Sequence, residues 1–160
     1  MHERASNRLL ALYRRLARFA LGRWLFGRLV CVRAPYFATI APRFDRLEPG
    51  VCEISMPDRR RVHNHLGTVH AIALCNLAEL AAGVVTDATL PPSMRWIPKG
   101  MQVDYLKKAR GRMRAVALPA VPIIASEAAY ELPVDVEVRD PSGDAVFRAR
   151  IAMWVSPKRR

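Results

Sequence analysis

The chain has 160 residues, 51% of them hydrophobic and 25% charged, which is typical of one globular domain with a sizeable core and excludes a disordered chain. Its three cysteines are odd in number and form no Cys-x-x-Cys pair, which argues against a disulfide framework or a four-cysteine zinc site and favours a reducing, cytoplasmic setting. The formal net charge of +12 indicates an anionic partner, either nucleic acid, anionic lipid or a phosphorylated small molecule.

The positive charge is concentrated at the N-terminus. Residues 1–43 contain nine arginines and one acidic residue, Glu3. Residues 5–20 are predicted to form an amphipathic helix, whose apolar stripe consists of Ala5, Leu9, Leu12, Leu16 and Phe19 or Ala20. Residues 19–32 continue apolar, but arginines interrupt the run too often for a membrane span or a signal-peptide core. We predict a basic helical extension over residues 1–42 and a domain over residues 43–160.

Three roles for the extension are compatible with this pattern. It packs over the domain and covers apolar surface, or residues 1–33 lie on an anionic membrane surface, for which a helix rich in Arg, Trp, Phe and Leu is suited, or it is a transit peptide or nucleic-acid arm. Because the domain has its own hairpins and central helix, we expect residues 43–160 to fold without it.

The remaining elements are strands around one helix. Two short strands flank the turn Glu48-Pro49-Gly50, and two longer ones flank residues 140–144 with clean apolar–polar alternation. The predicted strands are 43–47, 51–56, 94–106, 111–117, 130–138 and 147–155. A hairpin, a helix and about four antiparallel strands predict an α+β fold in which the sheet wraps around the helix.

The helix itself, from residue 71 to about residue 85, is apolar on every side. Its only strongly polar side chains are Asn76 and Glu79. A helix of this kind is buried, and about 15–17 residues are too few to span a bilayer easily. A carboxylate such as Glu79 is costly in this position unless it is paired or has a chemical role.

Two motifs, one at the start of the central helix and one at the end of a predicted strand, resemble those of a known family. The pattern Asn64-x-x-Gly67-x-x-His70, with Glu79 nine residues later, and the run from Asp104 to Gly111 resemble hotdog-fold thioesterases of the phenylacetate-degradation type. The match is closer to a thioesterase-like subgroup of poorly defined function whose loop reads Asn-His-x-Gly-Thr-x-His-Ala. The resemblance covers roughly residues 43–156 and implies a hotdog fold.

The resemblance implies an acyl-CoA thioesterase, a hydrolase of fatty acid metabolism, with its site at a dimer interface. Glu79 of one subunit would activate water against Asn64 and the helix end of the partner, in a homodimer or homotetramer. Thr68 as helix cap would leave the amides of His70 and Ala71 free to polarise the thioester oxygen. The alternatives are a structural carboxylate for Glu79 and a loop-ordering Asx-turn for Asn64.

Other residues are predicted to bind the substrate, and each also has a purely structural explanation. Gly67 meets a backbone requirement, and Asn76 is either a substrate contact or a satisfied buried amide. Four basic residues would hold the coenzyme A phosphates or form a solvated strand end: Lys107, Lys108, Arg110 and Arg112. Coenzyme A would enter as part of the substrate, with no separate cofactor.

The sequence departs from the family pattern at three points. His-Gly-Gly reads His70-Ala71-Ile72 here, Glu79 replaces the more usual Asp, and a helper Ser or Thr is absent near Pro98. The histidines at 63, 65 and 70 have no acidic residue close by in sequence, so no metal site is predicted.

No phosphate loop, nucleophile elbow or RNA-binding signature is present, so nucleic acid is not an expected partner. Two alternatives to hydrolysis remain. One is a non-catalytic protein that binds acyl-CoA or an acyl chain, and the other is a membrane-surface or regulatory protein that works through its basic helix. The expected location is cytoplasmic, with peripheral membrane contact in the last case.

Overall fold

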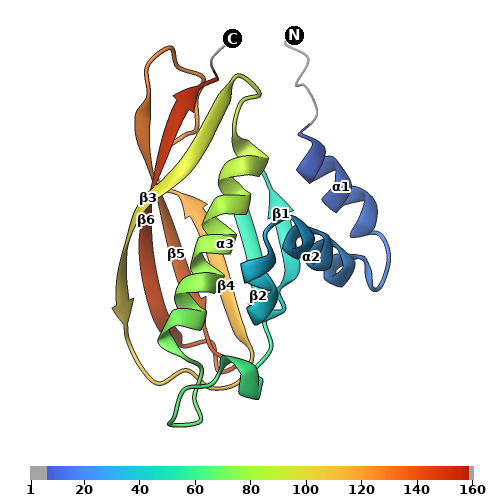
Figure 1. The fold of residues 1–160 in the computed structure, drawn as a ribbon, viewed down its shortest axis with the longest axis vertical. Coiled ribbons are helices and arrows are strands. Elements are labelled where there is room, and N and C mark those ends of the chain that lie inside the picture. The colour runs from blue at the N-terminus through green and yellow to red at the C-terminus, as the bar shows by residue number, and fades with distance from the viewer. Residues whose placement is uncertain (1–6, 159–160) are drawn as a thin grey trace.

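A six-stranded antiparallel sheet, in the order β1-β2-β4-β5-β6-β3, holds one long helix against its inner face (Figure 1). The computed structural model describes residues 7–158. The strands are β1 (Arg43–Glu48), β2 (Val51–Met56), β3 (Met94–Tyr105), β4 (Met113–Pro119), β5 (Tyr130–Arg139) and β6 (Ala145–Pro157), and the central helix is α3 (Ala71–Thr89). The α+β arrangement predicted from the sequence is confirmed, including the β5–β6 hairpin.

The central helix is longer than its apolar pattern indicates. It continues four residues past Val85, and the hydroxyls of Thr86 and Thr89 are satisfied within it by donating to the carbonyls of Ala82 and Val85, at 2.7 and 2.6 Å. It is the one helix among residues 7–158 with the length and composition of a membrane span. Twelve of its 19 residues are nevertheless buried in the protein, which identifies it as a core helix.

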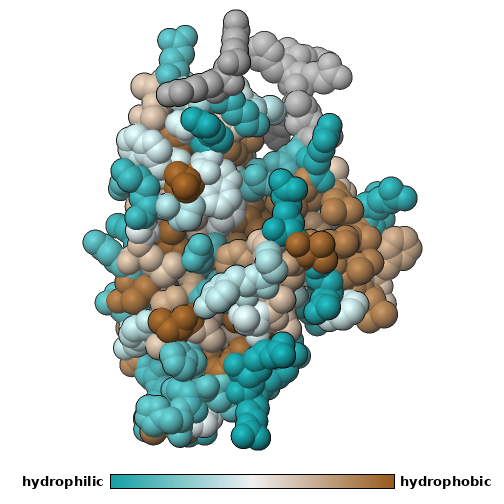
Figure 2. Space-filling model, viewed as in Figure 1, coloured by the Kyte–Doolittle hydropathy of each residue, from teal (hydrophilic) through white to brown (hydrophobic). Residues whose placement is uncertain are grey.

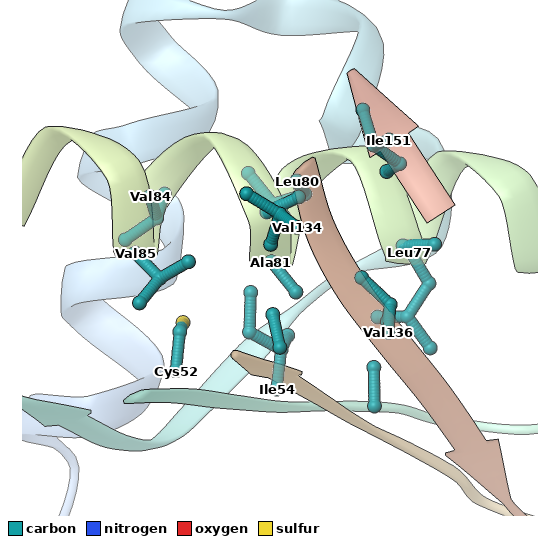
Figure 3. Close-up of a cluster of buried hydrophobic side chains, with 14 of the residues drawn as sticks. Cys52, Ile54, Leu77, Leu80, Ala81, Val84, Val85, Val134, Val136 and Ile151 are labelled. Carbon is teal, nitrogen blue, oxygen red and sulfur yellow. The ribbon is translucent and has the colours of Figure 1, made fainter. Parts of the chain in front are cut away.

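Alternating side chains of the sheet meet this helix in the core (Figure 3). Leu77, Ala81 and Val85 of α3 lie over Ile54 of β2 and Val136 of β5, all of them fully or almost fully buried. The inward residues follow a period of two in β5 and, from Phe147 onward, in β6. This alternation sets the strand register, because a shift by one residue would turn the apolar side chains outward.

Two further helices, α1 (Arg8–Leu16) and α2 (Gly22–Arg33), and the 3₁₀ segment η1 (Pro35–Ile40) precede the sheet. Phe26 of α2 is fully buried and makes edge-to-face contacts with Tyr13 and Phe44, at centroid distances of 5.2 and 4.9 Å. The hydroxyl of Tyr13 donates to the carbonyl of Asp45 on β1 at 3.2 Å. The helices therefore cover the β1 side of the sheet and share its hydrophobic core.

The predicted apolar stripe of the first helix is only partly right, because Leu9 and Leu16 pack against the core but are not its most buried residues. The buried residues of α1 are Leu10 and Tyr13, whereas Leu12 is 39% exposed, and Ala5 lies outside the described residues. α1 ends at Leu16, so Phe19 lies beyond it and is exposed. Contact with Phe26, rather than the widest stripe in the sequence, sets the rotation of this short helix. The packing also contradicts the expectation that the domain core is complete without the extension.

The other η segment, η2 (Arg60–Val62), leads from β2 toward the start of α3. It lies at the end of the molecule opposite the described chain termini (Figure 1). The loops that carry most of the predicted site residues gather at this end.

Candidate functional site

The loop before α3 is held together by Asn64. Its Oδ1 accepts hydrogen bonds from the backbone N–H groups of Leu66 and Thr68 at 3.0 and 3.2 Å, and its Nδ2 donates to Thr68 Oγ1 at 2.9 Å. Gly67 between them has a φ of +66°, the left-handed conformation that glycine adopts without strain. Within one chain Asn64 therefore orders its loop, as the Asx-turn interpretation anticipates.

The helix cap is His70, and the prediction of Thr68 is wrong. Thr68 is buried two residues earlier, whereas the N–H of Ile72 donates to His70 Nδ1 at 3.0 Å. The N–H of His70 donates to the carbonyl of Val62 at 2.7 Å, so it is not available to a substrate oxygen. Among residues 7–158, the Ala71 N–H has no acceptor, and it alone of the two predicted amides can serve as an oxyanion donor.

Glu79 lies two turns further along α3, half-buried in a groove of about 810 Å³. The groove runs between α3, the N-terminal helices and the start of β3, and its apolar lining includes Phe26, Val30, Phe37 and Trp96. No hydrogen-bond or ion-pair partner of Glu79 is found among the described residues. The groove is largely apolar but also includes Arg8, Arg33 and Asp87, and the Glu79 carboxylate forms no ion pair with them.

The floor of this groove depends on Gly83, one turn after Glu79. A Cβ at this position would lie 2.9 Å from the Trp96 ring. The indole of β3 can approach α3 closely only because residue 83 has no side chain.

One chain does not bring Glu79 to the Asn64 loop. Eight residues separate Ala71 from Glu79, which corresponds to about 12 Å along the helix axis. Between them, the buried side chain of Asn76 donates from Nδ2 to Thr39 Oγ1 at 3.0 Å, which satisfies one of its donors within the protein.

The basic loop after β3 lies against the start of α3. The Val69 N–H donates to the carbonyl of Ala109 at 2.9 Å, which places Lys108 and Arg110 beside the helix N-terminus. Both are exposed, as is Arg112, and none forms an ion pair within residues 7–158. Lys107 differs from them, because its ammonium pairs with Asp140 and Asp144 at 2.8 and 2.6 Å and its pKa is raised by these hydrogen bonds.

The sequence analysis missed a second contribution to this basic surface. Arg59, Arg60 and Arg61 are exposed on and beside η2, and Asp58, which precedes them, lies within the electrostatic influence of Arg110. Three consecutive arginines were the available signal, but their loop is joined to the 106–112 loop only by tertiary contacts.

Asp58 connects these two loops through two hydrogen bonds, which together form the Asp58 latch. Its carboxylate accepts hydrogen bonds from His63 Nε2 and from the Gly111 N–H. The bond to His63, followed by that to Gly111, lowers the pKa of Asp58 despite the opposing effect of burial. A lowered pKa means that the latch stabilises the fold at neutral pH and is lost as the pH falls through the folded-state value.

We expect Asp58→Ala to lower the free energy of unfolding by about 1 kcal/mol at pH 7, since it removes two hydrogen bonds to a charged, partly exposed group. The difference from the wild type should persist down to about pH 4, the ordinary pKa of an aspartate, and should narrow below it as the wild-type carboxylate becomes protonated. Urea unfolding at a series of pH values measures both effects. Asp104→Ala, which removes an exposed carboxylate on β3, is the control, and an equal pH dependence in both variants would contradict the latch.

The side chains of the three histidines at 63, 65 and 70 do not converge on one point. His63 bonds to Asp58, His70 caps α3, and His65 is exposed. No group of three or more His, Cys, Asp or Glu side chains that could hold a metal ion is found within residues 7–158.

Comparison with known proteins finds one matching family and several structures of the same fold. The family described as Domain of unknown function (DUF4442) matches residues 22–155, and no curated protein matches the sequence. The crystal structure of APC5556, a genomics target, is 44% identical, with a TM-score of 0.80 over 96% of this chain and 99% of that one.

Two further structures share the fold at low identity. The probable thioesterase PA5026 from Pseudomonas aeruginosa is 22% identical, with a TM-score of 0.71 over 81% of this chain and 92% of that one. Thioesterase HI1161 from Haemophilus influenzae is 15% identical, with a TM-score of 0.69 over 81% of this chain and 87% of that one. The chain thus has the hotdog fold of the thioesterase-like proteins, and it belongs to the DUF4442 family.

Proposed function

We propose that the protein hydrolyses an acyl thioester, with acyl-CoA as the substrate class, at a site shared by two subunits. The observation that carries this proposal is the half-buried Glu79 carboxylate, which lines an apolar groove of about 810 Å³ without a partner among residues 7–158. An apolar groove suits an acyl chain, and a positioned carboxylate suits a general base.

The two edges of the sheet indicate how a dimer would complete the site. The N-terminal helices pack on β1, whereas β3 is an edge strand of 12 residues in which Ile97 is 61% exposed. An open strand of this length is a surface for pairing with another chain. We propose that the dimer forms along β3.

An antiparallel pairing of β3 with its copy would bring the separated site residues together. Cys75 Sγ lies 3.3 Å from Tyr105 Oη, so the first turns of α3 lie beside the end of β3. Gly83 contacts Trp96, so Glu79 lies nearer the beginning of β3. Antiparallel pairing places the end of one strand beside the beginning of the other, and hence the partner's Ala71 near Glu79.

In this arrangement Glu79 takes a proton from water as the water oxygen attacks the thioester carbonyl carbon. The partner's Ala71 N–H and the positive end of its helix stabilise the oxyanion of the tetrahedral intermediate. The carbon–sulfur bond then breaks, and the protonated Glu79 returns the proton to the thiolate. The products are a carboxylic acid and a free thiol.

One observation favours the non-catalytic alternative, in which the protein binds acyl-CoA without cleaving it. The Asn64 side chain is engaged by its own loop at both Oδ1 and Nδ2, so it holds water or substrate only through remaining bonding capacity. Turnover of a panel of acyl-CoA and acyl-pantetheine thioesters by the full-length protein tests the proposal. Micromolar binding without turnover would replace it with the alternative.

Whether coenzyme A carries the acyl group is tested separately, by changing the basic residues of the 106–112 loop. We expect Lys108→Glu combined with Arg110→Glu to weaken coenzyme A binding several-fold at low salt, because exposed charge contacts are worth about 0.2–1 kcal/mol each and are screened beyond ~10 Å at 0.1 M salt. Calorimetry with coenzyme A and with an acyl-pantetheine lacking the nucleotide measures the effect. Equal weakening of both ligands would show that these residues do not contact the phosphates.

Lys107→Gln is the matched control for that experiment. Its ammonium is already held by Asp140 and Asp144, so its removal should change coenzyme A affinity less than the loss of Lys108 or Arg110. A larger effect at Lys107 would mean that the hairpin carboxylates release it on binding.

A further inference from the structure

The outward face of α2 is apolar. Its exposed hydrophobic side chains recur at helical spacing and include Leu21, which is 74% exposed, and Val32, which is 81% exposed. The full set is Leu21, Trp24, Leu25, Leu29 and Val32, of which Leu29 also lines the edge of the Glu79 groove. The opposite face, with Phe26 and Cys31, is buried in the protein. The helix thus has apolar residues on its solvent side, where a surface helix normally has polar ones.

The segment that carries this face is rich in arginine. Residues 7–42 contain seven arginines and no Asp or Glu, and none of the seven forms an ion pair within residues 7–158. Arg28 lies over the Trp24 ring at 5.9 Å, so a cation is part of the apolar face itself. Figure 2 shows hydrophobic side chains gathered over α2 with hydrophilic ones projecting around them.

Exposed apolar side chains together with arginines restrict the kind of partner that can bind the outward face of α2. A second copy of this chain seated on the same face would bring one set of arginines against the other, which is repulsive. Nucleic acid would neutralise the arginines but offers no apolar phase to five exposed hydrophobic residues. An anionic lipid surface satisfies both, since its headgroups pair with arginine while Trp and Leu enter the headgroup–acyl boundary.

We propose that the outward face of α2 docks the protein on anionic membrane surfaces. This inference is independent of the proposed thioesterase activity, and it gives residues 21–32 a role besides covering β1. The protein would lie on the bilayer as a peripheral protein, with α2 parallel to the surface.

Flotation of the full chain with phosphatidylcholine vesicles, with and without about 30% of the anionic lipid phosphatidylglycerol, tests this proposal. We expect binding only to the anionic vesicles and weaker binding as salt is raised. The emission of Trp24 should shift to the blue on binding, and Trp24→Phe should remove most of that shift.

Two variants separate the apolar and the charged contributions. Leu21→Asn combined with Val32→Asn removes exposed apolar groups, and Arg23→Glu combined with Arg28→Glu reverses charge. Each pair should weaken vesicle binding by about tenfold or more. Leu118→Asn on β4, and Lys108→Glu combined with Arg112→Glu on the 106–112 loop, match these changes elsewhere on the surface and should leave vesicle binding within about twofold.

Four outcomes would overturn the proposal. The first is equal binding to neutral and anionic vesicles, and the second is wild-type vesicle binding by the charge-reversal variant. The third is a change of the oligomer mass with the apolar variant, measured by light scattering without lipid, which would show that the face is covered by a second copy. Preferential binding to duplex DNA of the same charge concentration, unaffected by the apolar variant, would assign the arginines to nucleic acid instead.

Discussion

Glu79→Gln is expected to lower thioester turnover by about 10²–10⁴-fold while substrate binding persists, because an amide of the same shape cannot accept the proton from water. The carboxylate has no partner among the described residues, so its neutralisation should cost the fold little. Steady-state hydrolysis of an acyl-CoA, followed by release of the free thiol, measures the change.

Asp87→Asn is the matched control, since this carboxylate lines the same groove two turns further along α3. Its turnover should stay within a few-fold of the wild type. Wild-type turnover by Glu79→Gln would remove Glu79 from the reaction. Loss of folding in that variant, seen by circular dichroism, would identify Glu79 as a structural carboxylate.

The largest effect on stability is expected at Phe26. Replacing it with alanine should lower the free energy of unfolding by about 3–5 kcal/mol, as truncation of a fully buried aromatic residue does. It would open a cavity between Tyr13 and Phe44, both of which lose their edge-to-face partner. Urea unfolding monitored by circular dichroism measures the loss.

Trp24→Ala is the control on the same helix, because this aromatic residue is 52% exposed. It should cost about 1 kcal/mol or less, including the contact with Arg28. Similar costs for the two variants would mean that α2 does not pack on the sheet in solution. For the same reason, a chain that begins at residue 43 should aggregate, which is the opposite of what the sequence pattern alone leads one to expect.

Local patterns predicted the elements whose environment is set by the sheet. The alternation in β5 and β6 and the apolar surface of α3 are unambiguous because each side chain has only an inward or an outward position in the sheet, and none of the α3 faces is polar. The end of α3 was missed by four residues, since threonine hydroxyls that bond within the helix have no signature in the apolar pattern.

Features decided by contacts between distant residues could not be predicted in this way. The rotation of α1 depends on its contact with Phe26. The ammonium of Lys107 is engaged in ion pairs with two aspartates that lie over 30 residues away in the sequence. The cap at His70 competes with Thr68, whose hydroxyl is taken by Asn64. In each case the sequence gives the chemical capacity of a side chain, whereas the fold determines which partner uses it.

The open edge of β3 also bears on the solubility of the chain before it assembles. An unpaired strand can recruit other chains without limit, and stacks of this kind grow from flat segments of about six or seven residues. Here the register with β6 shifts between Pro98 and Gly100, and Pro98 has no N–H to donate. The edge is thereby divided into two runs, 94–97 and 101–105, which are both shorter than such segments. A twisted, interrupted edge of this kind favours a closed pair of subunits over an open-ended fibre.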